Sequence, residues 1–173
     1  MKNSMGLDVF INPRSVAVIG ASEKPGSWGS FIMTGLTSVD YHGKVFPVNP
    51  HAQHIFNLPA YKDIRDIPEP VDLAVLAVPT ASLEPAVIAC GQKKVKGITL
   101  ITAGFAETSK EGKERQTSLT QLAASYGMRV LGPNVSGTFN LTANFNASSI
   151  PGHNLLSKPV AAIWIRTCRC ATR

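Results

Sequence analysis

Ser15-Val16-Ala17-Val18-Ile19-Gly20-Ala21-Ser22-Glu23-Lys24-Pro25-Gly26-Ser27-Trp28-Gly29 is the stretch that decides the fold of this chain. An apolar run rich in β-branched residues leads into a glycine-rich turn, and a helical pattern follows. A parallel α/β sheet presents a phosphate site in this way, because the loop backbone is open and the next helix directs its N-terminus at the anion. A tight strand-to-helix turn that binds nothing has the same pattern, so the rest of the chain must decide between them.

The remaining chain continues the alternation of strands and helices. Residues 71–78 are apolar apart from Asp72, and such a run is typical of a central parallel strand covered on both faces. Pro47 lacks a ladder donor and therefore favours an edge position for its strand. The expected strands cover residues 15–19, 44–48, 71–78, 97–102 and 128–131, and the expected helices cover residues 28–38, 83–90 and 109–125, with at most a short helix around 61–67. This order predicts an α/β fold with a doubly wound parallel sheet and right-handed crossovers.

Several local expectations accompany this reading. Thr80 or Ser82 is expected to cap the helix that follows them, and Gly127 to end the helix of residues 109–125. Residues 135–158 look like a loop with little regular structure. Residues 160–165 have the composition of a possible sixth strand, but no glycine turn or helix follows them.

Composition and charge exclude several classes of protein. Of the 173 residues, 44% are hydrophobic and 16% are charged, which indicates one folded domain of ordinary size. The formal net charge is +6, but Arg166, Arg169 and Arg173 all lie near the end of the chain. The body is only mildly basic and has no basic stripe with interleaved aromatics, so we expect an anionic small molecule and no nucleic acid.

Cysteine usage and the N-terminal sequence point to an intracellular protein. Cys90 lies in an apolar helical pattern and is expected to be core, while Cys168 and Cys170 lack the partners of a zinc site. No apolar signal region and no run of transmembrane length is present, so we expect no membrane association and a cytoplasmic location.

The carboxyl ends of the expected strands supply turn residues and no catalytic set. In an open α/β sheet this edge binds ligands, yet it offers no Ser/His/Asp set and no carboxylate pair. The glycine spacing after Gly20 also departs from the dinucleotide fingerprint, and Asn49 stands where NAD-binding chains place an acidic residue. An NAD(P)-dependent oxidoreductase is therefore a weak alternative.

Five motifs in order resemble the CoA-binding domain of ADP-forming acyl-CoA synthetases, which is related to the α subunit of succinyl-CoA synthetase. The resemblance runs from about Phe10 to Pro159 and implies a Rossmann-like CoA-binding domain. The motifs are residues 15–22, Val45-Phe46-Pro47-Val48-Asn49-Pro50, residues 71–75 with Val78-Pro79, Gly104-Phe105-Ala106-Glu107, and Leu131-Gly132-Pro133-Asn134.

The resemblance implies a CoA site residue by residue. Lys24 would act as a point charge beside the helix dipole. The residues implied to hold the CoA phosphates are Gly20, Ala21, Ser22, Lys24, Pro25, Ser27, Trp28 and Gly29. Those implied near the adenosine are Asn49, Pro50 and His51, and those along the adenine and pantetheine path are Val78, Pro79 and Thr80. Those implied to flank the pantetheine arm are Ala103, Gly104 and Phe105, with Asn134 toward the thiol.

Departures from the family pattern concern one site residue, one short segment and the end of the chain. The segment is Ile55-Phe56-Asn57-Leu58, which stands where the family usually has a glycine. His51 stands where many members have lysine, and a neutral imidazole binds phosphate less strongly. The family continues past residue 160 into a second domain that carries a phosphorylated histidine, which none of His42, His51, His54 and His153 matches. We therefore expect residues 1–159 to form the CoA-binding domain and residues 160–173 to be an atypical tail, truncated or out of frame.

The parent reaction implied by the resemblance is acyl-CoA + ADP + phosphate ⇌ acid + CoA + ATP. The parent would need a second CoA-ligase domain and an ATP-grasp subunit or domain, with ATP, ADP and Mg²⁺ bound only in the complete enzyme. We expect this chain alone to bind CoA and catalyse nothing. The alternatives left open are a stand-alone CoA or nucleotide sensor and a regulatory part fused to an acetyltransferase. An exposed sheet edge would also favour homo-oligomers.

Overall fold

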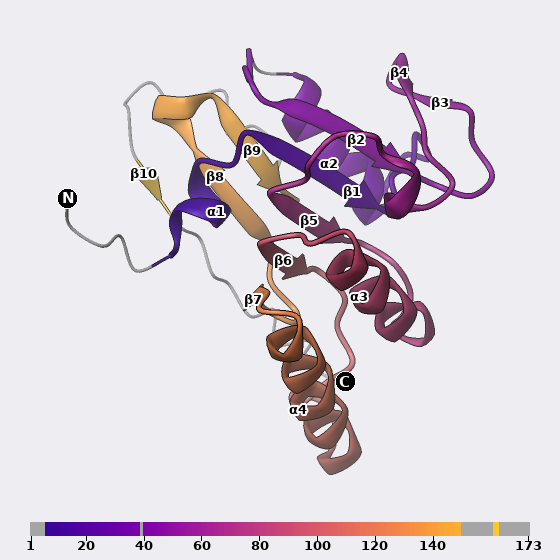
Figure 1. The fold of residues 1–173 in the computed structure, drawn as a ribbon, viewed down its shortest axis with the longest axis vertical. Coiled ribbons are helices and arrows are strands. Elements are labelled where there is room, and N and C mark those ends of the chain that lie inside the picture. Colours follow the sequence, from indigo (N-terminus) through magenta and orange to yellow (C-terminus); the bar gives the residue numbers. More distant parts are fainter. Residues whose placement is uncertain (1–5, 39, 150–160, 163–173) are drawn as a thin grey trace.

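A sheet of five parallel strands forms the centre of the molecule, in the spatial order β2-β1-β5-β6-β7 (Figure 1). The computed structural model describes residues 6–38, 40–149 and 161–162. The strands are β1 (Ser15–Ile19), β2 (Lys44–Val48), β5 (Leu73–Leu76), β6 (Gly97–Leu100) and β7 (Arg129–Leu131). The predicted parallel sheet is confirmed, with the predicted central strand in the middle and Pro47 in the edge strand β2.

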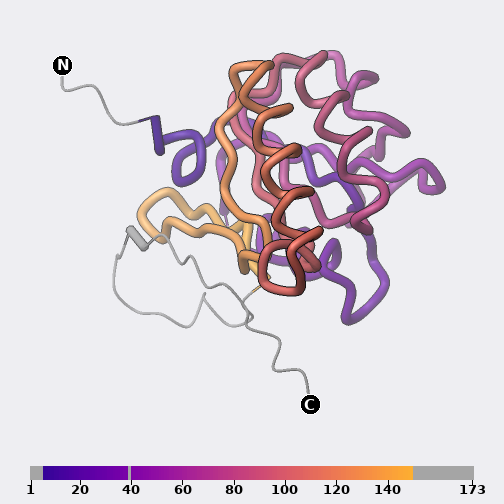
Figure 2. Tube along the Cα trace, turned by 90° about the horizontal axis from the view of Figure 1, so that it is seen from below, coloured from indigo at the N-terminus to yellow at the C-terminus, as the bar shows by residue number. Residues whose placement is uncertain are grey.

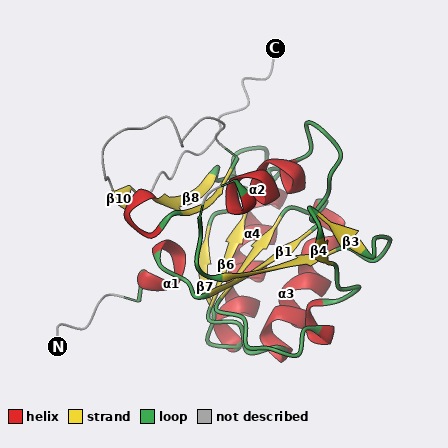
Figure 3. Ribbon diagram, turned by 90° about the horizontal axis from the view of Figure 1, so that it is seen from above, coloured by secondary structure: helices red, strands yellow, loops and turns green. Residues whose placement is uncertain are grey.

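Helices cover both faces of this sheet, as a doubly wound fold requires (Figure 3). Helix α2 (Trp28–Thr37) lies on one face, while α3 (Leu83–Gln92) and α4 (Lys110–Ser125) lie side by side on the other (Figure 2). The remaining helical segments are α1 (Asp8–Ile11) and the 3-10 turns η1 (Ile64–Asp66), η2 (Thr80–Ser82) and η3 (Leu141–Ala143).

Alternating side chains of the central strands divide the core into two layers. Val16 and Val18 of β1 join the layer beneath α2, whereas Ala17 joins the layer beneath α3 and α4. Every residue of β5 is buried, which explains why its sequence is a continuous apolar run rather than an alternating one. Cys90 of α3 is buried in the second layer, as expected.

The expectation of irregular structure after residue 135 was wrong for residues 137–148. Strands β8 (Gly137–Asn140) and β9 (Phe145–Ser148) form an antiparallel hairpin that packs against α2 and joins the core layer beneath that helix. The packing is so close that a Cβ atom on Gly35 of α2 would lie 2.5 Å from the side-chain nitrogen Nδ2 of Asn146. Residues 150–158 of the expected loop lie outside the described residues.

The expected sixth strand is not part of the parallel sheet. Only Ala161 and Ala162 are described there, as β10 (Ala161–Ala162), and they pair antiparallel with β8. The sequence could not distinguish the two sheets, because an apolar run fits either. The rest of the expected strand and of the 160–173 tail lies outside the described residues.

Two local features differ from the sequence expectations. Strands β3 (His54–Ile55) and β4 (Leu58–Pro59) form an unexpected small hairpin, with Phe56 and Asn57 at φ 51° and 60° in its turn. The predicted side-chain cap of α3 was wrong: Ser82 stands at the N-cap position but makes no capping hydrogen bond, because the chain first winds through η2. Gly127 follows α4 at φ +73°, as predicted.

Candidate functional site

The turn after β1 is built around two glycines that no other residue could replace without displacement. Gly20 has φ +88°, and a Cβ atom there would lie 2.5 Å from the carbonyl oxygen of Ala77. A Cβ atom on Gly29 would lie 2.0 Å from the carbonyl oxygen of Gly20. The first turn of α2 therefore rests directly on the end of β1, which brings the positive end of its dipole to the carboxyl edge of the sheet.

Hydrogen bonds within the loop hold it in this shape. The Lys24 amide donates to Ser22 Oγ at 3.0 Å, and Ser27 Oγ donates to the Lys24 carbonyl at 2.8 Å. Ser27 Oγ also accepts from the Ser30 amide at 3.2 Å and so caps α2. The expected phosphate residues Lys24 and Pro25 are exposed, as is Trp28, which makes an edge contact with Phe31.

Asn49 joins the loop after β2 to the loop after β1. Its Nδ2 donates to the carbonyl oxygen of Ala21 at 2.9 Å, and its Oδ1 accepts from the His51 amide at 2.9 Å. Both ends of this side chain are thus used within the protein. The amide that stands in the place of a ribose-binding carboxylate acts here as a brace between two loops.

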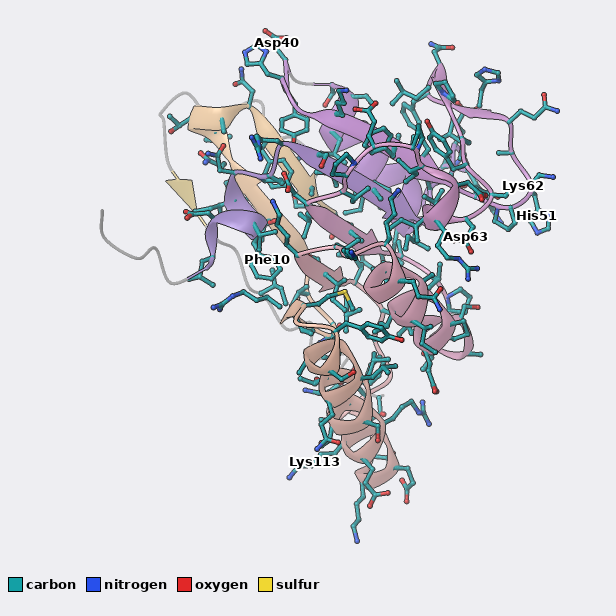
Figure 4. All side chains as sticks on the ribbon, viewed as in Figure 1. Phe10, Asp40, His51, Lys62, Asp63 and Lys113 are labelled. Carbon is teal, nitrogen blue, oxygen red and sulfur yellow. The ribbon has the colours of Figure 1, made fainter. Side chains whose placement is uncertain are left out.

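A cavity of about 350 Å³ lies at the carboxyl ends of β1, β2 and β5. Apolar side chains line it on the side of the sheet and of α3, and polar residues of the β2–β5 connection line the opposite side. His51, Lys62 and Asp63 lie at this side of the molecule (Figure 4). The lining residues are Ile19, Gly20, Val48, Asn49, Pro50, His51, Lys62, Asp63, Ile64, Arg65, Val78, Pro85, Ala86 and Ala89.

The structure thus brings together five of the residues expected at the site: Gly20, Asn49, Pro50, His51 and Val78. The segment from Lys62 to Arg65 also lines the cavity, although its sequence indicates only a connection with at most a short helix. One signal was available there, because Asp63 and Asp66 have the spacing of a capping box, and the structure shows that box at the start of η1.

Arg65 and Asp63 of this segment form an ion pair. Arg65 donates from Nε and Nη2 to the two carboxylate oxygens of Asp63 at 2.8 and 2.7 Å, and from Nη1 to Gln92 Oε1 at 3.1 Å. The side-chain hydrogen bond from Arg65 holds the pKa of Asp63 below its usual value, so the carboxylate is ionised at neutral pH. The guanidinium is oriented by these bonds, and its charge is largely offset.

The other expected residues lie at the ends of β5, β6 and β7. Thr102 Oγ1 donates to the Val78 carbonyl at 2.6 Å, and Thr80 Oγ1 donates to the Ala103 carbonyl at 3.4 Å. Pro79 and Ala103 are exposed. These bonds align the ends of β5 and β6 as one shallow edge.

Gly104, Phe105 and Asn134 are held by the fold in different ways. The Gly104 amide donates to Glu107 Oε1 at 2.7 Å; burial opposes ionisation of Glu107, but backbone donors outweigh it and hold its pKa below the usual value. Phe105 is fully buried in the core and lines a second cavity of about 600 Å³ between α3 and α4. Asn134 is 7% exposed, and its backbone N–H donates to the Thr102 carbonyl at 3.1 Å.

Two further classes of site are not found among the described residues. Within residues 6–38 and 40–149, no group of three His, Cys, Asp or Glu side chains could hold a metal ion. No helix in the described part of the chain has the length and hydropathy of a membrane span.

Comparison with known families gives a match that spans most of the chain. Residues 14–139 match the family described as a CoA binding domain. That range contains β1, β2 and β5–β7, and with them the cavity and the loops around it.

Named relatives and a solved structure agree with this match. The chain is 45% identical over 144 residues to the alpha subunit of ADP-forming acetate–CoA ligase II of Pyrococcus furiosus, covering 83% of this chain and 31% of that protein. It is 40% identical over 132 residues to the ADP-forming 4-hydroxybutyrate–CoA ligase of Nitrosopumilus maritimus, covering 76% and 19%. Acetyl-coenzyme A synthetase 1 of Ca. Korarchaeum cryptofilum, solved in complex with phosphate and ADP, superposes with a TM-score of 0.81 at 40% identity, covering 84% and 31%. The chain therefore spans a third or less of the length of these proteins.

Proposed function

The chain belongs to the CoA-binding domain family, and we propose from this premise that it binds coenzyme A across the carboxyl ends of its parallel strands, as the CoA-binding part of an ADP-forming acyl-CoA ligase. The observation that carries the proposal is the cavity of about 350 Å³ at the ends of β1, β2 and β5. Its size falls within the range of small-molecule sites, and its apolar floor with a polar rim suits an adenosine group.

The parts of CoA match the chemistry along this edge. The diphosphate would lie at the loop between Gly20 and Gly29, where the dipole of α2 and the exposed Lys24 favour an anion. The adenine would occupy the cavity between Gly20 and Val78, with its ribose toward the loop that follows β2.

The pantetheine arm would pass along the aligned ends of β5 and β6. It would run past Val78, Pro79 and Thr80 and between the turns at Ala103 and Gly104, toward Asn134. A long, mostly uncharged arm needs shallow contacts with backbone groups, which this edge offers. Phe105 would support that path from the core rather than touch the arm, because its side chain is fully buried.

The complete ligase would convert an acid, CoA and ATP into acyl-CoA, ADP and phosphate. Relatives named for acetate and for 4-hydroxybutyrate are several times longer than the matched region, which supports additional domains as the source of ATP binding and acid choice. We propose a second CoA-ligase domain and an ATP-grasp unit as the partners of this chain. Its own part is to bind CoA and to orient the thiol.

An NAD(P)-binding site is less well supported by the geometry. Chains that bind NAD usually hold the ribose diol with a carboxylate at the end of β2. Asn49 stands there instead, and its amide group already bonds to Ala21 and His51.

Calorimetric titration of the purified chain with CoA, dephospho-CoA and NAD tests the proposal. We expect saturable binding of CoA, weaker binding of dephospho-CoA, and none of NAD. Binding of NAD without CoA would overturn the ligand assignment, and so would the absence of CoA binding to a folded chain. Incubation with acetate, CoA and ATP should give no acyl-CoA from this chain alone.

A further inference from the structure

Three cationic or potentially cationic side chains lie around the cavity of about 350 Å³ in which we place the adenosine of CoA. They differ in whether their charge is available to a phosphate. They are His51, Lys62 and Arg65, all of which line the cavity. CoA differs from dephospho-CoA only by the phosphate on the 3′-oxygen of its adenosine ribose. A site of this fold places the ribose beside the end of the second strand, so this phosphate would lie among these three side chains.

Arg65 is the least available of the three. Both carboxylate oxygens of Asp63 accept from its guanidinium, and Gln92 accepts from the remaining terminal nitrogen. A phosphate that recruited Arg65 would have to displace a bidentate ion pair within the protein. The Arg65 guanidinium is therefore held by Asp63 and Gln92 and is not a free cation for a ligand.

His51 carries an imidazole in place of an ammonium or guanidinium group. In its neutral form an imidazole contributes one hydrogen bond to a phosphate but no ionic attraction. The backbone amide of His51 is already bonded to Asn49 Oδ1.

Lys62 is exposed, and within residues 6–38 and 40–149 it makes no ion pair. The neighbouring carboxylate of Asp63 is occupied by Arg65, so it does not hold the ammonium group of Lys62. Figure 4 shows Lys62 and His51 at the same corner of the molecule, beyond the ends of β1 and β2. A flexible ammonium group that is already at the rim needs no rearrangement of the fold to meet a phosphate.

We infer that Lys62 is the residue by which this site recognises the 3′-phosphate of CoA and so distinguishes CoA from dephospho-CoA. The inference rests on the proposed function, since it assumes that the adenosine of CoA occupies this cavity. It assigns the cation of this subsite to the connection between β2 and β5 rather than to the loop that directly follows β2.

Substitution of Lys62 tests the inference by the ratio of two affinities. We expect Lys62→Ala to weaken CoA binding about 10-fold, as loss of a charge-assisted contact does, and to change dephospho-CoA binding less than twofold. Lys62→Arg should keep most of the preference for CoA. Lys113→Ala, on the distant α4, is the matched control, and it should leave both affinities unchanged (Figure 4). Both lysines are exposed, and equal melting temperatures would show that the variants fold.

Each result separates the inference from the proposed function. If the unsubstituted chain binds neither ligand, the proposed function fails, and the inference fails with it. If that chain binds CoA but Lys62→Ala weakens CoA and dephospho-CoA equally, or changes neither, the function stands and the inference is overturned. Loss of the preference in Arg65→Ala instead of in Lys62→Ala would also overturn it, in favour of the arginine.

Discussion

The side-chain amide of Asn49 donates to the carbonyl oxygen of Ala21 at 2.9 Å, so the loop after β2 is braced against the loop after β1. These loops would carry the ribose and the diphosphate of the same ligand. Asn49→Ala should therefore lower the free energy of unfolding by about 1–2 kcal/mol, because it removes this hydrogen bond and the one that Asn49 Oδ1 accepts from the His51 amide. It should also weaken CoA binding about tenfold, because the two halves of the site lose their fixed separation. Urea unfolding and calorimetric titration measure the two effects.

Gln121→Ala serves as the control for Asn49, since it removes an exposed amide from α4, away from the loops. It should leave stability and affinity unchanged. A variant of Asn49 that is destabilised yet binds CoA as tightly as the unsubstituted chain would show that the brace supports the fold only.

Two glycines of the same loop should respond differently to alanine. At Gly29 the new Cβ would lie 2.0 Å from the backbone oxygen of Gly20, and backbone cannot move aside cheaply, so Gly29→Ala should cost about 3 kcal/mol of stability. At Gly26 the new Cβ meets open space, but φ is +81°, so Gly26→Ala should cost only about 1 kcal/mol. Denaturant unfolding of both variants gives the comparison, and equal costs would contradict the packing of α2 on β1.

The sequence predicted the parallel sheet well because its strands are buried on both faces. Residues 71–78 have no polar alternation to obscure the strand, and Gly20 and Gly29 mark the turn that packs the first helix. Such signals are local, since each depends only on the residues of its own element.

Local sequence signals could not predict the hairpin β8–β9 or the position of Lys62 beside the cavity. Thr138, Asn146 and Ser148 are polar yet buried. Asn146 lies against Gly35 of α2, a tertiary contact that nothing in the sequence of the hairpin shows. Lys62 reaches the cavity because the buried Ile64 anchors η1 near α3, which is a tertiary contact between segments far apart in the chain.

Cys90 should be protected from alkylation in the native protein. Burial raises the pKa of its thiol to about 12, with a smaller contribution from the charge of Asp63, so the reactive thiolate is scarce at pH 8. We expect iodoacetamide to modify Cys90 at pH 8 only after unfolding in urea, as measured by mass spectrometry of its peptide. Equal rates of modification in native and unfolded protein would contradict its place in the core.

Asp72 should make the free energy of unfolding depend on pH. It directly precedes β5, at the amino ends of the strands and opposite the candidate site. Burial alone would raise the pKa of Asp72, but hydrogen bonds from Lys96 Nζ at 2.6 Å and from the Arg14 amide at 3.0 Å outweigh it and hold that pKa below the usual value. The folded state then favours the carboxylate. The stabilisation is therefore complete above the pKa of the unfolded chain, about 3.9, and is lost as pH falls through the lower folded value.

Asp72→Asn should accordingly cost about 1–2 kcal/mol at pH 7, a range that allows for solvent screening of the exposed Lys96. The difference from the unsubstituted chain should shrink as pH falls from about 4 towards the lower folded-state pKa, because the Asp72 carboxylate of the unsubstituted chain then also takes up a proton. Thermal unfolding at pH 7 and pH 3 measures it, with Asp40→Asn as the matched exposed control (Figure 4). A difference that is the same at both pH values would mean that the amide disturbs packing around Ser15, and that the ionised carboxylate does not stabilise the sheet.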